Sequence, residues 1–193
     1  MSQLLKFIVA GCIAISFIPM LADSAISATA TEDGLKQGDA IGVFYVTKVA
    51  GAEDDGVEPG EDLCYRCRYG SRPMVMVFAR ETGGKVPELL KAIDTAVADS
   101  EEESLRGLLT LLGEDASALK DVAGKIATSS DVKMVPIAVA KEPKTGPMNY
   151  KLAENAPVTI VLAKDSQVVT THTFTAEKID VDSVMKEVAK MLN

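Results

Sequence analysis

The stretch "GPMNYKLAENAPVTIVLAKDSQVVTTHTF" (146–174) gives the strongest indication of the fold. After a loop rich in glycine and proline, it contains two runs of β-branched residues on either side of Lys-Asp-Ser-Gln (164–167). Two such runs around a short polar turn predict a β-hairpin. Residues 180–192 follow with apolar residues at helical spacing behind Asp180, which predicts a closing amphipathic helix with an aspartate cap.

Upstream of this hairpin, strand-like and helix-like segments alternate along the chain. The leucine-rich segment 104–115 is ambiguous between helix and strand. The alternation implies βαβ units and a largely parallel sheet, with the hairpin as an antiparallel addition. We expect strands at 41–49, 74–80 and 132–140, and helices at 85–100 and 116–129.

The first 28 residues have the pattern of a secretory signal peptide. Lys6 precedes an apolar run (7–22), and small residues follow at alternate positions. We expect cleavage after Ala25 or Ala28. The mature chain would then have no stable membrane span and would be secreted or periplasmic.

The cysteine in this leader suggests a second interpretation. Val-Ala-Gly-Cys (9–12) resembles a bacterial lipobox, which would make Cys12 a lipidated N-terminus. However, five residues separate Lys6 from Cys12, and the apolar run continues well beyond it. A lipoprotein signal places its apolar core before the cysteine, so we favour the cleaved signal peptide.

Length and composition point to one globular domain after the leader. Hydrophobic residues make up 47% of the 193 residues, and the formal net charge is −8. We expect a flexible leader at 29–40 and a single domain at 41–193. The acidic segment 50–62 lacks the spacing of a calcium loop, so we interpret it as a solvated loop. The net negative charge argues against nucleic acid as a partner. A monomer is one of the states that the sequence allows.

The mature chain keeps one cysteine pair, Cys64 and Cys67, in a CxxC motif. In an oxidising compartment such a pair is expected to form a disulfide. The neighbouring Arg66, Arg68 and Arg72 would favour thiolate over thiol, so we assign Arg66 and Arg68 a pKa-tuning role. Two hypotheses remain open. The pair is either a redox site, which we place slightly ahead, or a structural disulfide with its arginines solvated or paired to acidic residues.

The segment 146–174 also resembles the C-terminal half of redoxin-type thioredoxin-fold proteins, which are exported thiol-disulfide exchange proteins related to peroxiredoxins. Tyr150, Pro157 and the turn at 164–167 occupy matching places, and the resemblance extends over roughly 41–192. It implies an α/β thioredoxin-like fold, with a central mixed sheet of about five strands flanked by helices. It also implies a strand at 105–112, a cis peptide bond before Pro157, and protein thiols or disulfides as partners.

The position of the CxxC departs from that family. There the redox motif follows the strand equivalent to 74–80, but here residues 81–86 read Glu-Thr-Gly-Gly-Lys-Val. Because Cys67 precedes this strand, we expect both cysteines toward its opposite pole. The pair is then a relocated redox site or a structural staple. By analogy with the first cysteine of a CxxC, Cys64 is expected to attack.

The remaining motifs argue against a cofactor. A closed zinc site needs four ligands, and haem attachment needs histidine where Arg68 stands. Two thiolates and His172 would satisfy copper(I), which leaves copper handling as a weaker alternative. We therefore expect no metal or cofactor. The leading hypothesis is a thiol-disulfide oxidoreductase, and the competing one is a non-catalytic binding or scaffold domain.

Overall fold

The computed structural model describes residues 34–193. The expected signal peptide, Cys12 and most of the expected leader lie outside the described residues. Within 34–193, no helix is both long enough and apolar enough to span a membrane.

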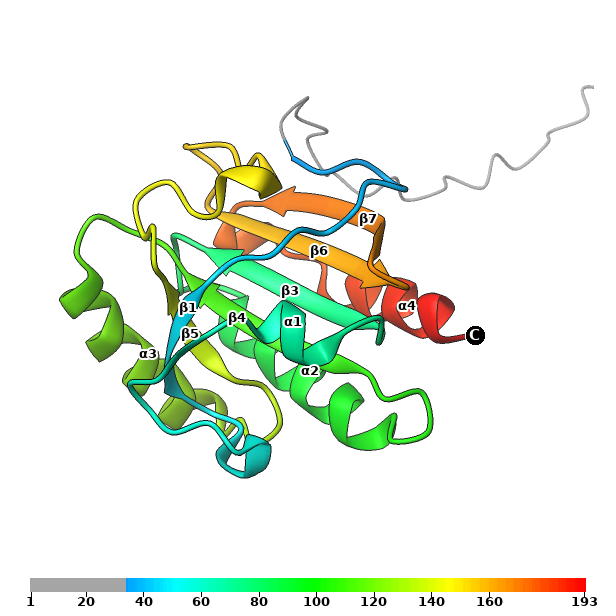
Figure 1. The fold of residues 1–193 in the computed structure, drawn as a ribbon, viewed down its shortest axis with the longest axis horizontal. Helices are drawn as coiled ribbons and strands as arrows, with labels where there is room; N and C mark the ends of the chain where they lie inside the picture. The colour runs from blue at the N-terminus through cyan, green and yellow to red at the C-terminus, as the bar shows by residue number, and fades with distance from the viewer. Residues whose placement is uncertain (1–33) are drawn as a thin grey trace, which may run out of the picture.

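A seven-stranded sheet forms the centre of the domain, with the strand order β2-β1-β5-β4-β3-β6-β7 (Figure 1). The expectation of about five strands is therefore wrong in number. The edge strand β2 lies in the segment that the sequence indicated as a solvated loop. The strands are β1 (Val46–Ala50), β2 (Asp62–Leu63), β3 (Met74–Ala79), β4 (Arg106–Leu111), β5 (Ile137–Ala140), β6 (Val158–Lys164) and β7 (Gln167–Phe174).

The sheet is mixed, as expected, but it is not largely parallel, because four of the six strand pairings within residues 34–193 are antiparallel. Strands β3, β4 and β5 are parallel, and β6 and β7 add the antiparallel hairpin beside β3. The hairpin turns at Asp165 and Ser166, which both have positive φ (54° and 64°), as the turn of a two-residue hairpin requires. At the other side, β1 pairs antiparallel with β5 and with β2.

The leucine-rich segment 104–115 forms strand β4, as the resemblance implies. Gly107, which argued against a helix in this segment, lies where Ile93 of α2 and Val135 of the loop before β5 approach the sheet. A Cβ at this position would lie 2.7 Å from Val135 Cγ2 and 3.0 Å from Ile93 Cγ2. The glycine is therefore explained by close packing.

The two faces of the sheet are covered differently. One face packs against the amphipathic helices α2 (Val86–Asp99), α3 (Ala116–Ser130) and α4 (Val181–Leu192). On the other face, the short helix α1 (Tyr65–Tyr69) and the extended segment 35–45 cover the strands (Figure 1). Three 3-10 turns complete the fold, namely η1 (Glu53–Asp55), η2 (Met148–Tyr150) and η3 (Ala176–Lys178).

An aromatic cluster fills the core under segment 35–45. Phe44, Phe78 and Tyr150 pack together with ring centroids 5.0 to 5.6 Å apart. The Tyr150 hydroxyl donates a hydrogen bond to the carbonyl of Gly42 at 3.0 Å. Tyr150 is one of the residues on which the resemblance to redoxins rests. Its hydrogen bond and its ring packing hold segment 35–45 against the sheet.

The peptide bond before Pro157 is trans, like every other peptide bond within residues 34–193. The expectation of a cis bond is therefore wrong. The trans form is the ordinary preference of an X–Pro bond. The Pro157 carbonyl accepts hydrogen bonds from the backbone N–H of Arg80 and Glu81, at 2.8 and 3.2 Å. This bonding joins the start of β6 to the end of β3 without a cis bond.

Candidate functional site

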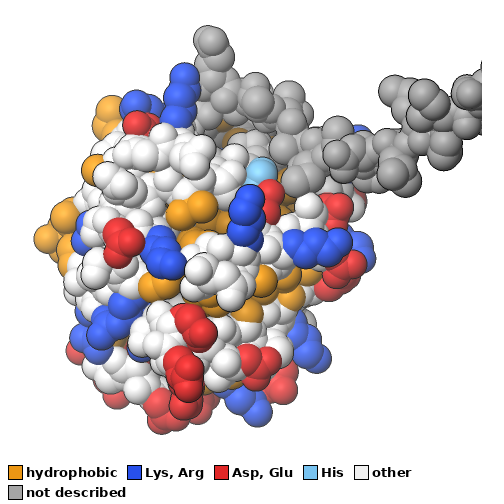
Figure 2. Space-filling model, turned by 90° about the vertical axis from the view of Figure 1, so that its right-hand side faces the viewer, with side chains coloured by type: hydrophobic (Ala, Val, Ile, Leu, Met, Phe, Trp, Pro, Cys, Tyr) orange, Lys and Arg blue, Asp and Glu red, His pale blue; other side chains and the backbone are white. Residues whose placement is uncertain are grey.

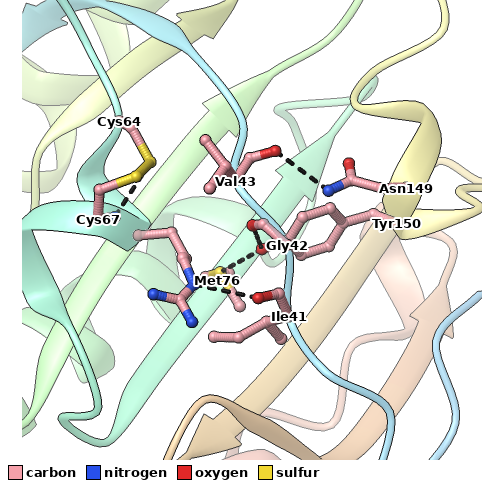
Figure 3. Close-up of a disulfide and its surroundings, with 9 residues drawn as sticks. Ile41, Gly42, Val43, Cys64, Cys67, Met76, Asn149 and Tyr150 are labelled. Carbon is pink, nitrogen blue, oxygen red and sulfur yellow. Dashed lines mark hydrogen bonds between the residues drawn. A yellow bond between two sulfur atoms is a disulfide. The ribbon is translucent and has the colours of Figure 1, made fainter.

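The CxxC motif forms a disulfide at the start of α1. Cys64 is the residue that precedes the helix, Cys67 lies within it, and their Cα atoms are 5.2 Å apart. This separation is ordinary for a disulfide. Figure 3 shows the pair beside the segment that carries Ile41, Gly42 and Val43.

The cysteines do not lie where the sequence placed them. Leu63 of β2 pairs with Val46, and Val46 pairs with Ala140, the last residue of β5. Cys64 is therefore level with the C-terminal end of β5, at the outer side of the sheet. Helix α1 then leads back over the sheet face to the start of β3. The expectation of the opposite pole is wrong because β2, which the sequence did not reveal, first carries the chain to the C-terminal end.

The two sulfur-bearing residues differ in exposure. Cys64 is 7% exposed, whereas Cys67 is exposed. The backbone N–H of Cys67 points at the Cys64 Sγ, with an N···S distance of 3.0 Å. A donor at this distance stabilises negative charge on that sulfur. The pair therefore combines one accessible sulfur with one that is sheltered and already hydrogen-bonded.

An open hollow of about 500 Å³ lies beside the disulfide. Both cysteines line it, together with the apolar side chains of Tyr45, Val57 and Leu63. The Tyr45 side chain is unusually exposed for its size, at 57%. A partner chain approaching Cys67 would meet an apolar surface next to the accessible sulfur.

A buried ionic network holds α1 from the side of the acidic loop. Lys48 is 1% exposed, and its Nζ donates to Asp55 Oδ1 at 2.7 Å and to the carbonyls of Ala52 and Val57. The other oxygen of Asp55 accepts a hydrogen bond from the Tyr65 hydroxyl at 2.7 Å. Burial, followed by the neighbouring Asp55, raises the pKa of Tyr65 far above its usual value. The loop expected to be simply solvated thus has a fixed position next to the disulfide.

Sequence reasoning missed the network residues Lys48, Asp55 and Tyr65. One signal was available, because Lys48 is a lone charge in an otherwise apolar strand segment. Such a residue needs a buried partner. The identity of the partner was not readable, since several acidic residues follow in the loop.

The arginines of the motif bind backbone carbonyls. Arg66 Nε donates to the Ile41 carbonyl at 3.1 Å, and Arg68 Nη2 donates to the carbonyl of Asp55. Within residues 34–193, neither forms a salt bridge. They are thus neither simply solvated nor paired with carboxylates. These hydrogen bonds join α1 to segment 35–45 and to η1.

His172 lies far from the disulfide in the fold. It is on β7, at the opposite edge of the sheet from β2, and its Nε2 is 2.7 Å from Glu187 Oε2 of α4. In the described part of the chain, no group of three or more His, Cys, Asp or Glu side chains is arranged to hold a metal ion. The copper site formed by the two cysteines and His172 is therefore wrong.

The turn after β3, where redoxins carry their cysteines, is fixed here by hydrogen bonds to backbone carbonyls. Arg80 donates to the Lys144 carbonyl at 2.7 Å, and Lys85 N donates to the Ala176 carbonyl at 2.8 Å. Gly84 has a φ of 54°, and a Cβ there would lie 2.7 Å from the Ala176 backbone. This turn joins β3 to α2 and carries no sulfur.

Charges of both signs share the surface. Figure 2 shows the side of the β6–β7 hairpin and α4, where hydrophobic side chains are interspersed among basic and acidic ones. The net charge of −8 is therefore not spread as one uniform negative field. Local groupings of like charges decide which ligands a given surface attracts.

Comparison with solved structures identifies the fold. No protein-family model and no curated protein matches the chain. A candidate thiol:disulfide interchange protein, DsbE, from Chlorobium tepidum superposes with a TM-score of 0.60 at 14% identity, covering 82% of this chain and 99% of that one. AhpC from Mycobacterium tuberculosis gives 0.62 at 11% identity, with 82% and 99% covered. The exposed lipoprotein thioredoxin of Streptococcus pneumoniae gives 0.54 at 14%, with 77% and 99% covered. The chain has a thioredoxin-like fold of the redoxin type.

Proposed function

We propose that this thioredoxin-fold chain exchanges thiols and disulfides with protein partners at Cys64 and Cys67. The observation that carries the proposal is the inequality of the two residues, one exposed and one sheltered beside a backbone donor. An exchange site needs one sulfur that a partner reaches and one that leaves readily as thiolate. The residues of this CxxC divide these two roles between them.

The unequal exposure of the two cysteines supports the following order of steps. A partner thiolate attacks Cys67 Sγ, the Cys64–Cys67 bond breaks, and its electron pair goes to Cys64 Sγ. The Cys67 N–H stabilises the resulting Cys64 thiolate before it takes up a proton from water. A second partner thiolate then attacks the partner's sulfur in the mixed disulfide and expels the Cys67 thiolate, which takes up a proton, so an oxidised partner is released and the dithiol remains. The attacked sulfur is thus that of Cys67, although analogy favours Cys64 as the reactive one.

The same arrangement of the two cysteines also supports the reverse reaction, in which the protein dithiol reduces a partner disulfide. The exposed Cys67 thiolate attacks a partner disulfide and expels one partner thiolate. Cys64 then attacks Cys67 Sγ, re-forms the protein disulfide and expels the second thiolate. The apolar hollow with Tyr45, Val57 and Leu63 supports an unfolded or extended protein chain as the partner.

Two further points support this role in an exported protein. One structural neighbour is a candidate thiol:disulfide interchange protein, and another is an exposed lipoprotein thioredoxin. The signal-peptide pattern in the first 28 residues predicts the same route out of the cytoplasm. N-terminal sequencing of the secreted protein tests export, with a start after Ala25 or Ala28 as the expected result.

A structural disulfide is the second candidate, and one observation favours it. Helix α1 is tied down by the Tyr65–Asp55 and Arg66–Ile41 hydrogen bonds, as expected of a segment that stays in place. The domain would then bind partners through its surface without redox chemistry. The absence of cysteine in the turn after β3 is compatible with such a loss of activity.

The reduction potential of the Cys64–Cys67 pair separates these candidates. We expect thiol labelling of the mature protein in graded glutathione buffers to give roughly −120 to −270 mV, the range of working oxidoreductases. A value below about −300 mV would mean a structural bridge and would overturn the proposal.

Single-cysteine variants test the order of attack. We expect Cys64→Ser, which keeps the exposed Cys67, to form a mixed disulfide with an aromatic disulfide probe much faster than Cys67→Ser. Without the first 28 residues, which include Cys12, the two variants each carry one thiol and differ only in its position, so each controls for the other. Equal rates, or a faster Cys67→Ser, would contradict the assignment of Cys67.

A further inference from the structure

A second hollow, of about 560 Å³, shares Arg68 with the hollow beside the disulfide. Its walls come from five separate parts of the chain, which include η1, α1, the end of α2, the start of β4 and the loop after α3. Four cationic side chains line it, namely Arg68, Arg72, Arg106 and Lys133. In a protein with a net charge of −8, this is an unusual concentration of positive charge.

The charge of these four side chains is not neutralised by neighbouring carboxylates. None of them takes part in a salt bridge within residues 34–193. Of the two aspartates that line the hollow, Asp55 is already paired with Lys48, so Asp54 alone faces the four cations. The hollow therefore has an excess of positive charge.

The arginines are anchored through backbone carbonyls, which hold them without cancelling their charge. Arg72 Nη1 donates to the carbonyls of Arg68 and Tyr69 at 3.3 and 3.2 Å, and Arg106 Nη1 donates to the Leu105 carbonyl at 3.1 Å. A guanidinium has five N–H donors, so most of them remain for a ligand. Planar forks of this kind match carboxylates in a bidentate manner.

The floor and rim of the hollow are fixed by hydrogen bonds as well. The Tyr69 hydroxyl donates to the Gly107 carbonyl at 3.1 Å. The Asp94 carboxylate accepts backbone N–H groups from Lys133, Met134 and Val135 at 2.7 to 3.1 Å. The backbone on which these cations stand is thus held before any ligand arrives, which lowers the entropic cost of binding.

We infer that this hollow binds the carboxylates of a small acidic peptide thiol, such as glutathione, whose sulfur then exchanges with Cys67. Arg68 lines both hollows and is the residue next to Cys67, so a peptide held by the cations lies one side chain from the accessible sulfur. The inference rests on the proposed exchange at Cys67 and adds the class of thiol. Two peptide thiols are consumed, one in the mixed disulfide and one to resolve it, giving one peptide disulfide and the protein dithiol.

A binding experiment tests the hollow without any redox step. S-methylglutathione keeps both carboxylates but has no free thiol, and its binding to the oxidised protein is measured by NMR titration. We expect Arg72→Gln and Arg106→Gln each to weaken binding by about tenfold to a hundredfold, as the loss of a hydrogen bond to a charged group predicts. Lys125→Gln, an exposed cation on α3 away from the hollow, is the matched control and leaves binding unchanged. Thermal unfolding checks that Arg106→Gln, at a half-buried position, stays folded, and Arg106→Lys is the second variant there.

A kinetic experiment then links the hollow to the disulfide. Reduction of Cys64–Cys67 is followed with glutathione and with 2-mercaptoethanol, a neutral thiol. We expect Arg72→Gln and Arg106→Gln to slow the reaction with glutathione several-fold more than the reaction with 2-mercaptoethanol. The preference for glutathione also falls as salt is raised, because screening weakens contacts between exposed charges.

The outcomes separate this inference from the proposed function. If S-methylglutathione does not bind, or binds equally to the arginine variants, the acidic-thiol inference is wrong even where 2-mercaptoethanol reduces the disulfide readily. If the peptide binds but neither thiol reduces the disulfide in the folded protein, the proposed exchange fails and the hollow is an anion site only. Equal slowing with both thiols would mean that the arginines shape α1 instead of binding the peptide.

Discussion

The two faces of the sheet are built by different kinds of sequence. On one face, three helices of 14, 15 and 12 residues bury a continuous set of aliphatic side chains. On the other, a five-residue helix and an extended segment are held by tyrosine hydroxyls, arginines and a buried lysine. The first face depends on hydrophobic packing, whereas the second depends on specific polar partners. The disulfide lies on the second face. Because this face depends on individual polar contacts, we expect breaking the disulfide to affect the structure around α1 first.

The largest effect that distinguishes the faces is expected from Asp55→Ala. Removing this carboxylate leaves Lys48, which is 1% exposed, as an unpaired buried charge and frees the Tyr65 hydroxyl. Breaking a buried pair in this way costs about 3–5 kcal/mol of unfolding free energy. Urea unfolding measures the loss.

Asp54→Ala is the matched control for this prediction, since it removes an exposed carboxylate from the adjacent position of the same loop. We expect a change within about 0.5 kcal/mol for it, as for most surface substitutions. A loss below 1 kcal/mol for Asp55→Ala would mean that packing, and not the ionic network, holds the second face.

The next effect is that of the disulfide itself. A bridge between Cys64 and Cys67 closes a very small loop, and the chain-entropy relation assigns it roughly 2 kcal/mol of stability. We therefore expect the reduced protein to stay folded with a modestly lower unfolding free energy. Hydrogen exchange of α1 and segment 35–45, compared between the two redox states, locates the change. Loosening of α2 or α4 as well would show that the faces are not independent.

The sequence revealed the helical face well because its signals are local. Apolar spacing within 85–100 and 180–192 predicts α2 and α4 closely, and the hairpin around Asp165 and Ser166 follows from composition alone. Each of these patterns concerns residues that touch across one or two turns of the same element. Strand β4 needed the resemblance, because its leucines favour helix and only its neighbours make it a strand.

The second face was hidden because its contacts join distant residues. Tyr65 meets Asp55, Arg66 meets Ile41, and neither pairing has a periodic pattern. Strand β2 has two residues and lies in an acidic, glycine-rich segment, so nothing in composition marks it. Its absence from the prediction placed the cysteines at the wrong end of the sheet. The cysteine pair was found by its spacing, whereas its position, its unequal exposure and the cationic hollow required coordinates.

A smaller effect is expected from Tyr150→Phe, which removes one hydroxyl from the second face. The change deletes the hydrogen bond to the Gly42 carbonyl and keeps the aromatic packing with Phe44 and Phe78. The loss of one neutral hydrogen bond costs about 1 kcal/mol. Urea unfolding gives the size, and hydrogen exchange of segment 35–45 gives the place. An unchanged exchange rate in that segment would contradict the fastening role of Tyr150.

The smallest effect concerns the edge strand β2 and depends on pH. The hydrogen bonds from Lys141 and then from Thr47 lower the pKa of Asp62 below its usual 3.8. Because the folded-state pKa is the lower one, the contribution of Asp62 to stability is present above the unfolded value and is lost as pH falls through the folded one. Asp62 is exposed, so the contribution is small and weakens with salt. We expect Asp62→Asn to lower the melting temperature slightly at pH 6, with a difference from the unmodified protein that vanishes at acid pH. The absence of a difference at pH 6 would mean that β2 is held by its backbone pairing with β1 and not by this carboxylate.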